Sequence, residues 1–417
     1  MTDVIDLLAG LSAEGPLDAV RHRRSQAREN AQRSFAALLE PTDDRGFTLA
    51  ERYAVATFVA AVHGDDAAVR FYGDLLADED SDLLATVLRA ASAGLGTGPV
   101  GVYREPGLSD ESIPVEAYGV PDAVVPVLGE RLTAALEHTH LLVFRPRESS
   151  ADALRRLVAA GWDADQIVSL SQLVSFLAFQ LRAVAGLRAV SGSATRAWAA
   201  PEVAAAGQPH TTPAETDLVT EHDGIHRPEV FTQDGLGWVP WLAPVEREEL
   251  TPEQLEALIE PARAAMPYFR LLARDPAALE ARTLTDLDIF TNTDGGLPRA
   301  ARELSAATAS RLNGCVFCAS VHAAFATRES GRRDDVQRLL DEGVAADLGD
   351  EQWNAVAAAS AALAATPPAL TETHVARLRD AGLDDAAIVD AVNGAAFFSW
   401  ANRLMLSLGE PEVPARR

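Results

Sequence analysis

The 417-residue sequence has little of what strands and disulfide-rich folds require. It contains two cysteines, aromatic residues make up 6% of it, and runs of β-branched residues are few, whereas alanine is abundant. Alanine is the best helix former, and β-branched and aromatic residues are typical of strands. The composition therefore predicts an all-α protein, and the length allows two domains with separate cores.

Other absences argue against whole classes of location and partner. The N-terminal segment MTDVIDLLAGLSAEG has no basic region followed by an apolar one, so we expect no secretory signal peptide. No run of about eighteen uninterrupted apolar residues is present, which argues against a transmembrane helix. The net charge of −25 at pH 7 argues against nucleic acid and anionic membranes as partners. We expect a cytoplasmic protein that binds neither.

Both cysteines lie close together, at Cys315 and Cys318, and His322 follows four residues after the second. Residues 316–326 have helix-forming composition without a helix breaker, so the two thiols and the imidazole would share one helix face. Asn313-Gly314 predicts the end of a preceding helix. We therefore expect Cys315 in the first turn of the new helix, where the helix dipole favours a thiolate.

The spacing of these residues favours redox chemistry. A thiolate attacks electrophilic oxygen or sulfur, and a neighbouring thiol then resolves the product as a disulfide. His322 adds a base, or a cation when protonated, one turn beyond Cys318. Half a zinc site is the alternative, but zinc needs about four ligands and the sequence has no second cluster of Cys and His. We interpret the pair as a redox dithiol without a metal.

Glu303 completes a recognisable pattern. It lies twelve residues before Cys315, and the intervening residues are typical of a helix and a turn, so the carboxylate can fold back against the next helix. Glu, Cys-x-x-Cys and His in this alanine-rich context resemble the superfamily of the alkylhydroperoxidase AhpD and carboxymuconolactone decarboxylase. Residues 231–411, with the closing stretch FFSWANRLMLSLGEP, resemble more narrowly its peroxidase-related alkylhydroperoxidase-domain proteins.

The resemblance implies an antioxidant peroxidase of the peroxiredoxin type that uses no metal, haem, flavin or other cofactor. It implies that Cys318 is the peroxidatic thiolate and Cys315 the resolving thiol. His322 would assist deprotonation of Cys318 through water, and Glu303 would orient or charge-balance His322. The substrate would be a hydroperoxide, and an external dithiol or a protein thiol would reduce the disulfide. Phe317 departs from the pattern, because AhpD has a relay histidine just before the second cysteine.

Two other functions stay open on the sequence alone. One is a lyase like carboxymuconolactone decarboxylase, which would act on a lactone acid through acid and base residues instead of thiols. The other is a non-catalytic redox sensor whose disulfide changes its assembly. Replacement of Cys318 by Ser separates the three functions, because only a peroxidase loses turnover.

A repeat indicates an internal duplication. Residues 160–168 (AGWDADQIV) match residues 381–389 (AGLDDAAIV) at an offset of 221, and the match continues to Arg182 against Arg403. In both segments a glycine can end one helix and an aspartate can cap the next. We therefore predict two copies of one AhpD-like helical domain. By resemblance to the superfamily, such chains form a homo-oligomer, here a trimer of two-domain chains.

The predicted copies differ in their chemistry. Residues 1–200 resemble carboxymuconolactone decarboxylase domain proteins that lack the cysteine pair, and residues 238–417 form the AhpD-like domain with Cys-x-x-Cys-x-x-x-His. Residues 201–237 carry Pro, Gly, Thr and acidic residues without an apolar period and are predicted as a linker.

The first copy has its own candidate positions. Counting from Glu51 as the counterpart of Glu303 places His63, Asp66 and Arg70 at the positions of the two cysteines and the histidine. Without a thiol this copy cannot perform dithiol chemistry, and a structural role is favoured. The alternative hypothesis is a polar pocket of Glu51, His63 and Arg70 for an acidic or lactone substrate, with His63 as general base.

Overall fold

The chain folds almost entirely into helices, as predicted. The computed structural model describes residues 3–193, 196–200, 202–222 and 224–415. Within these ranges the only strands are β1 (Gly237–Pro240) and β2 (Gly409–Glu412), which pair antiparallel. The prediction of an all-α protein is confirmed.

The helices fall into two successive sets. The first set comprises α1 (Val4–Ala9), α2 (Pro16–His22), α3 (Ser25–Leu39), α4 (Leu49–Val62), α5 (Asp66–Glu79), α6 (Ser81–Ala93), α7 (Val125–Phe144), α8 (Ala151–Ala159) and α9 (Ala164–Ser191), with 3-10 turns at Pro106–Glu111 and Pro146–Glu148. The second set comprises α10 (Pro252–Ala257), α11 (Pro267–Leu272), α12 (Pro276–Thr291), α13 (Arg299–Asn313), α14 (Val316–Ser330), α15 (Arg333–Glu342), α16 (Glu351–Ala364), α17 (Glu372–Asp380) and α18 (Asp385–Leu408), with 3-10 turns at Arg247–Glu249 and Pro261–Ala265.

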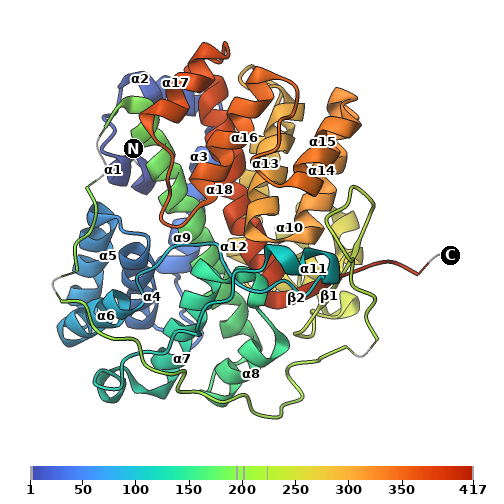
Figure 1. Ribbon diagram of the computed structural model, residues 1–417. Coiled ribbons are helices and arrows are strands. Elements are labelled where there is room, and N and C mark those ends of the chain that lie inside the picture. Colours follow the sequence, from blue (N-terminus) through green and yellow to red (C-terminus); the bar gives the residue numbers. More distant parts are fainter. Residues whose placement is uncertain (1–2, 194–195, 201, 223, 416–417) are drawn as a thin grey trace.

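The long helices α9 and α18 pack against each other at the centre of the molecule (Figure 1). Both are buried along most of their length, as expected of helices that are apolar on all sides. Among the described helices, α9 alone is long and apolar enough to cross a membrane, with a mean hydropathy of 1.5 over its most apolar window. That window is 100% buried within the protein, so α9 is a core helix of this fold.

The order of the helices repeats between the two sets. Helices α8 and α9 begin at Ala151 and Ala164, and α17 and α18 begin at Glu372 and Asp385, which is the offset of 221 seen in the sequence. The five helices α3 to α7 also correspond in order to the five helices α12 to α16. Like helices of the two sets meet, α3 with α12 and α9 with α18. This arrangement supports the two-copy organisation that we propose from the repeat.

Two fully buried arginines join the sets reciprocally. The Arg182 guanidinium on α9 donates to the Ala364 carbonyl at the end of α16, at 3.0 Å. The Arg403 guanidinium on α18 donates to the Val143 carbonyl at the end of α7, also at 3.0 Å. Both the arginines and their acceptors are separated by 221 residues. Each arginine thus satisfies carbonyls that a helix end leaves unpaired, which is a structural role.

The predicted linker contacts residues before it and after it in the chain. Pro201 and Asp223 lie outside the described residues. The remainder follows the outside of the molecule as an extended segment (Figure 1). Gly207 pairs with Gly119, and Arg227 forms ion pairs with Glu105 at 2.7 Å and Glu410 at 2.5 Å. The segment also contacts both sets of helices, because the His210 N–H donates to Glu137 on α7 at 3.0 Å and the Thr327 hydroxyl on α14 donates to Gln233 at 2.5 Å. The domain boundaries stay a prediction.

The role of Arg182 can be tested by its removal. We expect Arg182→Ala to lower the free energy of unfolding by about 3 kcal/mol, because it leaves buried carbonyls of α16 without donors and opens a cavity. Chemical denaturation measures this change. The exposed Arg377 on α17 provides the control, and Arg377→Ala should change the free energy by about 0.5 kcal/mol or less. Equal small effects of both substitutions would contradict the structural role.

Candidate active site

The turn between α13 and α14 positions the two thiols. Gly314 ends α13 with φ of 82°, a left-handed conformation that glycine adopts without steric cost. Cys315 then has extended backbone and is the N-cap of α14, so it precedes the first turn in which we expected it. Its Sγ accepts a hydrogen bond from the backbone N–H of Cys318 at 3.4 Å. The cap therefore turns the first thiol toward the second.

The two sulfur atoms lie 2.7 Å apart and the cysteines are free thiols. A disulfide bond is shorter, about 2.04 Å, so a small movement would join them. Cys315 is 1% exposed and Cys318 is 4% exposed. Burial and the adjacent Cys318 thiol raise the pKa of Cys315 well above its ordinary value. The expectation that the helix dipole favours a thiolate at Cys315 is not supported, because burial disfavours the charged form of this thiol.

The structure brings His322 and Glu303 together, as the resemblance implies. Glu303 lies on α13 with 1% exposure, and the His322 Nδ1–H donates to its carboxylate at 2.6 Å. The Arg299 Nε donates to the other carboxylate oxygen at 3.2 Å. With Nδ1 engaged in this way, Nε2 is the ring nitrogen left to accept a proton. Within the described part of the chain, no hydrogen bond joins His322 directly to Cys318.

Aromatic rings enclose the imidazole. The ring centroid of Phe398 on α18 lies 3.9 Å from that of His322, and Phe290 on α12 lies 5.5 Å away. Phe317, which replaces the relay histidine of AhpD, is partly buried. The imidazole therefore has an apolar surround on one side and a carboxylate on the other, which fixes its orientation.

Three polar residues near this site were missed in the sequence. They are Tyr268 on α11 and Arg282 and Asp286 on α12. Burial raises the pKa of Asp286, against the opposing effect of the Arg282 guanidinium. Arg282 and Asp286 are four residues apart and so share a helix face, but nothing else in the sequence marks them. Their proximity to the thiols arises only from the packing of α11 and α12.

The counterparts in the first copy do not form a similar site. Glu51 belongs to the N-terminal capping box of α4 and pairs with Arg131 at 2.8 Å. Arg70 is largely exposed and pairs with Asp66 at 2.9 Å. The contact that joins Glu303 to His322 therefore has no equivalent between Glu51 and Arg70.

His63 has both ring nitrogens occupied. Its Nδ1–H donates to the Val59 carbonyl at 2.8 Å, and its Nε2 accepts from the Arg182 guanidinium at 3.1 Å. Burial and the positive charge of Arg182 lower the pKa of His63 well below its ordinary value. His63 lines a cavity of about 400 Å³, but Glu51 and Arg70 do not. A general base needs a free nitrogen that faces substrate, so the role of His63 as general base is not supported.

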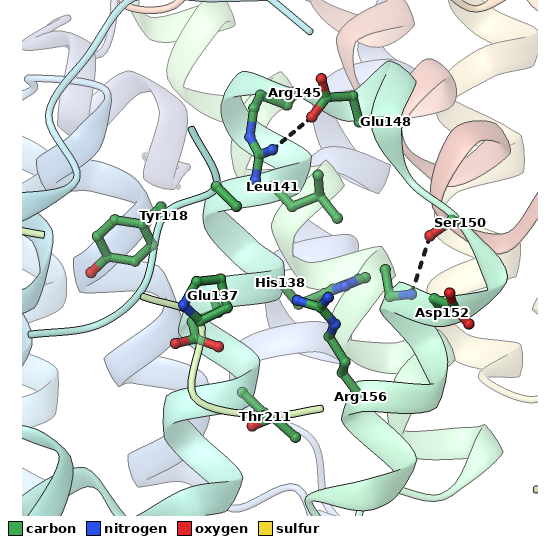
Figure 2. A pocket seen from close by; sticks show the side chains of 14 residues that line it. Tyr118, Glu137, His138, Leu141, Arg145, Glu148, Ser150, Asp152, Arg156 and Thr211 are labelled. Atoms are coloured by element: carbon green, nitrogen blue, oxygen red, sulfur yellow. Dashed lines mark hydrogen bonds and ion pairs between the residues drawn. The ribbon is translucent and has the colours of Figure 1, made fainter. Parts of the chain in front are cut away.

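A different cavity lies in the first set of helices, with a volume of about 180 Å³ between α7, α8 and the linker segment. Figure 2 shows Glu137, His138 and Arg156 together in this cavity. His138 is 5% exposed, and neither ring nitrogen has a partner among the described residues. Burial lowers the pKa of His138 to about 4 and raises the pKa of Glu137. The imidazole is therefore neutral at pH 7.

No metal site accompanies either location in the described ranges, where no group of three or more His, Cys, Asp or Glu residues could hold a metal ion. The two thiols thus have no set of additional ligands of the kind that zinc requires.

Comparison with known proteins identifies the region that carries the thiols. Residues 276–361 match the model of the Carboxymuconolactone decarboxylase family. No match was found among the curated proteins. The matched region begins with α12 and extends into α16, and it contains Glu303, both cysteines and His322. The chain therefore carries a carboxymuconolactone decarboxylase or AhpD-like domain at these residues, which suggests alkylhydroperoxidase or decarboxylase-like activity.

The different environments of the thiols predict which one reacts first. In the reduced protein at pH 8, we expect one equivalent of iodoacetamide to alkylate Cys318, because the raised pKa keeps Cys315 as a neutral thiol and only thiolates react readily. Peptide mass spectrometry locates the adduct. Cys315→Ser should react about as fast as wild type, and Cys318→Ser should react more slowly by a factor of about ten or more. Preferential alkylation of Cys315 would refute this assignment.

Proposed function

We propose that the AhpD-like domain is a cysteine-based alkyl hydroperoxide reductase. The observation that carries this proposal is the pair of free thiols 2.7 Å apart, next to a histidine that is hydrogen-bonded to a buried glutamate. A dithiol needs a second thiol in reach to form a disulfide, and a base to generate its thiolate. Both requirements are met on α13 and α14.

The reaction proceeds in two steps. The Cys318 thiolate attacks the terminal oxygen of the hydroperoxide, an S–O bond forms, the O–O bond breaks, and the departing alkoxide takes a proton to become an alcohol. The Cys315 sulfur then attacks the Cys318 sulfenic acid, the S–S bond forms, and water leaves. Two electrons pass from the thiols to the peroxide. An external dithiol or protein thiol returns both cysteines to the reduced form by thiol–disulfide exchange.

The geometry supports these roles. Cys318 is the more exposed of the two cysteines, and the neutral thiol of Cys315 suits the resolving role. His322 Nε2 accepts the proton of Cys318 through a water molecule, and Glu303 stabilises the resulting imidazolium through Nδ1. Because Phe317 cannot relay protons, this histidine carries the proton transfer alone.

The setting of the reaction is also part of the proposal. The active chain is a homo-oligomer, a trimer of two-domain chains, in the cytoplasm. Resemblance to the superfamily supports the trimer, and a reducing compartment supports a working dithiol in preference to a structural disulfide.

Consumption of cumene hydroperoxide with dithiothreitol as reductant tests the proposal. Cys318→Ser should abolish turnover, and His322→Gln should lower kcat/KM about 100-fold, because general-base assistance is lost. Arg333→Gln, an exposed change on α15, is the control and should match wild type.

Two outcomes would overturn the peroxidase assignment. Turnover retained by Cys318→Ser would assign the activity elsewhere. A wild-type protein that consumes no peroxide, but changes oligomeric state when its thiols are oxidised, would be a redox sensor.

The cavity in Figure 2 favours a second candidate function, a lyase that acts on a lactone acid. His138 offers a neutral, unpartnered imidazole as base, and Arg156 offers a guanidinium that forms no ion pair with a described residue. These are the groups that an acid–base reaction on a carboxylate substrate needs.

Single substitutions separate this lyase from the peroxidase. If the lyase operates, His138→Gln should lower its turnover of a lactone acid about 100-fold, and Cys318→Ser should leave it unchanged. Spectrophotometric loss of a carboxymuconolactone measures both variants. Full lyase activity in His138→Gln would exclude this cavity as the lyase site.

A further inference from the structure

Arg282 is a buried cation without an acceptor. Its side chain on α12 is 5% exposed, yet it forms no hydrogen bond or ion pair with any described residue, and its Nε is buried without a partner. Every other buried arginine of the described chain donates to a carboxylate or a carbonyl, such as Arg24 to Asp390 at 2.7 Å or Arg302 to Ile289 at 2.7 Å. Burial of a charge without a hydrogen-bonded partner is costly. Arg282 therefore lacks the hydrogen-bond acceptor that the other buried arginines of the described chain have.

The groups around Arg282 do not replace that partner. The guanidinium carbon lies 5.1 Å from the ring centre of Phe397, 5.8 Å from that of Tyr268 and 5.9 Å from that of Trp400. These rings attract the cation but offer it no hydrogen-bond acceptor. Asp286, one turn further along α12, is near enough for the Arg282 charge to oppose the rise of its pKa, but no ion pair or hydrogen bond joins the two among the described residues. Burial raises the pKa of Asp286, which weakens it further as a counter-ion.

Two neighbouring groups are unpartnered hydrogen-bond donors as well. The hydroxyl of Tyr268 and the Nε1–H of Trp400 are both buried without a partner among the described residues. Burial raises the pKa of Tyr268, so its hydroxyl keeps its proton and can donate. Arg282, Tyr268 and Trp400 thus bring together three donors that have no acceptor. A carboxylate has two oxygens that accept and no proton to donate, so it complements this set.

This cluster of donors adjoins the thiols. Both Cys318 and Cys315 lie within electrostatic range of the Tyr268 hydroxyl. On α18, Phe397 touches the Arg282 guanidinium, and the next residue, Phe398, packs on the His322 ring at 3.9 Å. A molecule whose carboxylate binds Arg282 would therefore extend toward the redox centre.

We propose that the substrate of the dithiol centre is the hydroperoxide of an organic acid, whose carboxylate binds Arg282 together with Tyr268 and Trp400. This inference rests on the proposed peroxidase function and specifies its substrate class. Arg282 is then a specificity residue that selects anionic hydroperoxides over neutral ones of the same size.

Two matched substrates test the inference. Cumene hydroperoxide and its para-carboxylate differ only in the charged group. Wild type should reduce the carboxylate with a kcat/KM at least about tenfold higher, which is the effect of one charge-assisted hydrogen bond. In Arg282→Met this ratio should fall to about one, and in Tyr268→Phe it should fall in part. Arg333→Gln removes one positive charge from an exposed position and should keep the wild-type ratio.

Binding of a carboxylate to Arg282 can be tested even if the protein reduces no peroxide. We expect 4-isopropylbenzoate to raise the Tm of wild type and Tyr268→Phe, whereas 4-isopropylbenzamide should not, and neither should raise the Tm of Arg282→Met. If no peroxide is reduced but this pattern holds, the peroxidase proposal fails and the carboxylate site stands.

The stability of the free protein excludes a purely structural role. Because Arg282 is an unpaired buried cation, Arg282→Met should unfold at the same or a higher temperature than wild type. A lower Tm in Arg282→Met, with the substrate ratio unchanged, would show that Arg282 only packs between the aromatic rings. That result would overturn the inference.

Discussion

The interior of this protein depends on one constraint, which is that every buried guanidinium needs an acceptor. The sequence contains no lysine, so arginine supplies all the permanent cations of the helical core. Arg182 and Arg403 meet the constraint with carbonyls at the ends of α16 and α7, and in doing so they join the two sets of helices. Arg24 meets it with Asp390 on α18. Arg282 does not meet the constraint with any described residue, and we propose that the carboxylate of a ligand does.

The redox centre reflects a similar balance between burial and reactivity. Burial holds the two thiols side by side and protects them from unspecific oxidation, but it also disfavours the thiolate, as the raised pKa of Cys315 shows. The hydrogen bond between Glu303 and His322 opposes this effect, because it places a carboxylate behind the base that would take the proton of Cys318. The negative charge of the buried Glu303 carboxylate would thus compensate the positive charge that proton transfer creates on His322.

Local sequence signals predicted much of the active helix pair. Gly314 marked the end of α13, the Cys-x-x-Cys-x-x-x-His spacing predicted a shared face of α14, and the interval from Glu303 predicted that its carboxylate folds back against the next helix. The pairing of Glu303 with His322 was implied by the resemblance to the superfamily. The offset of 221 anticipated equal positions for α8 and α17, and for α9 and α18. Such features follow from backbone conformation and helical periodicity, which neighbouring residues determine.

Features that arise from packing between distant segments were not predictable. The donors of Arg282, Tyr268 and Trp400 come from three helices, and no spacing in the chain relates them. His63 aligned with a catalytic position, but Arg182, more than a hundred residues away, occupies its second nitrogen. The buried helix α9 was not marked by an uninterrupted apolar run, because polar residues that are buried within it interrupt the run.

The most direct test of the central claim is a single-turnover titration of the reduced protein with one equivalent of cumene hydroperoxide. Intact mass and free-thiol count are followed in wild type and in Cys318→Ser. The account predicts rapid loss of both thiols in wild type, with the mass of an intramolecular disulfide, and little reaction in the variant. Thiols that stay reduced for hours in wild type would contradict it.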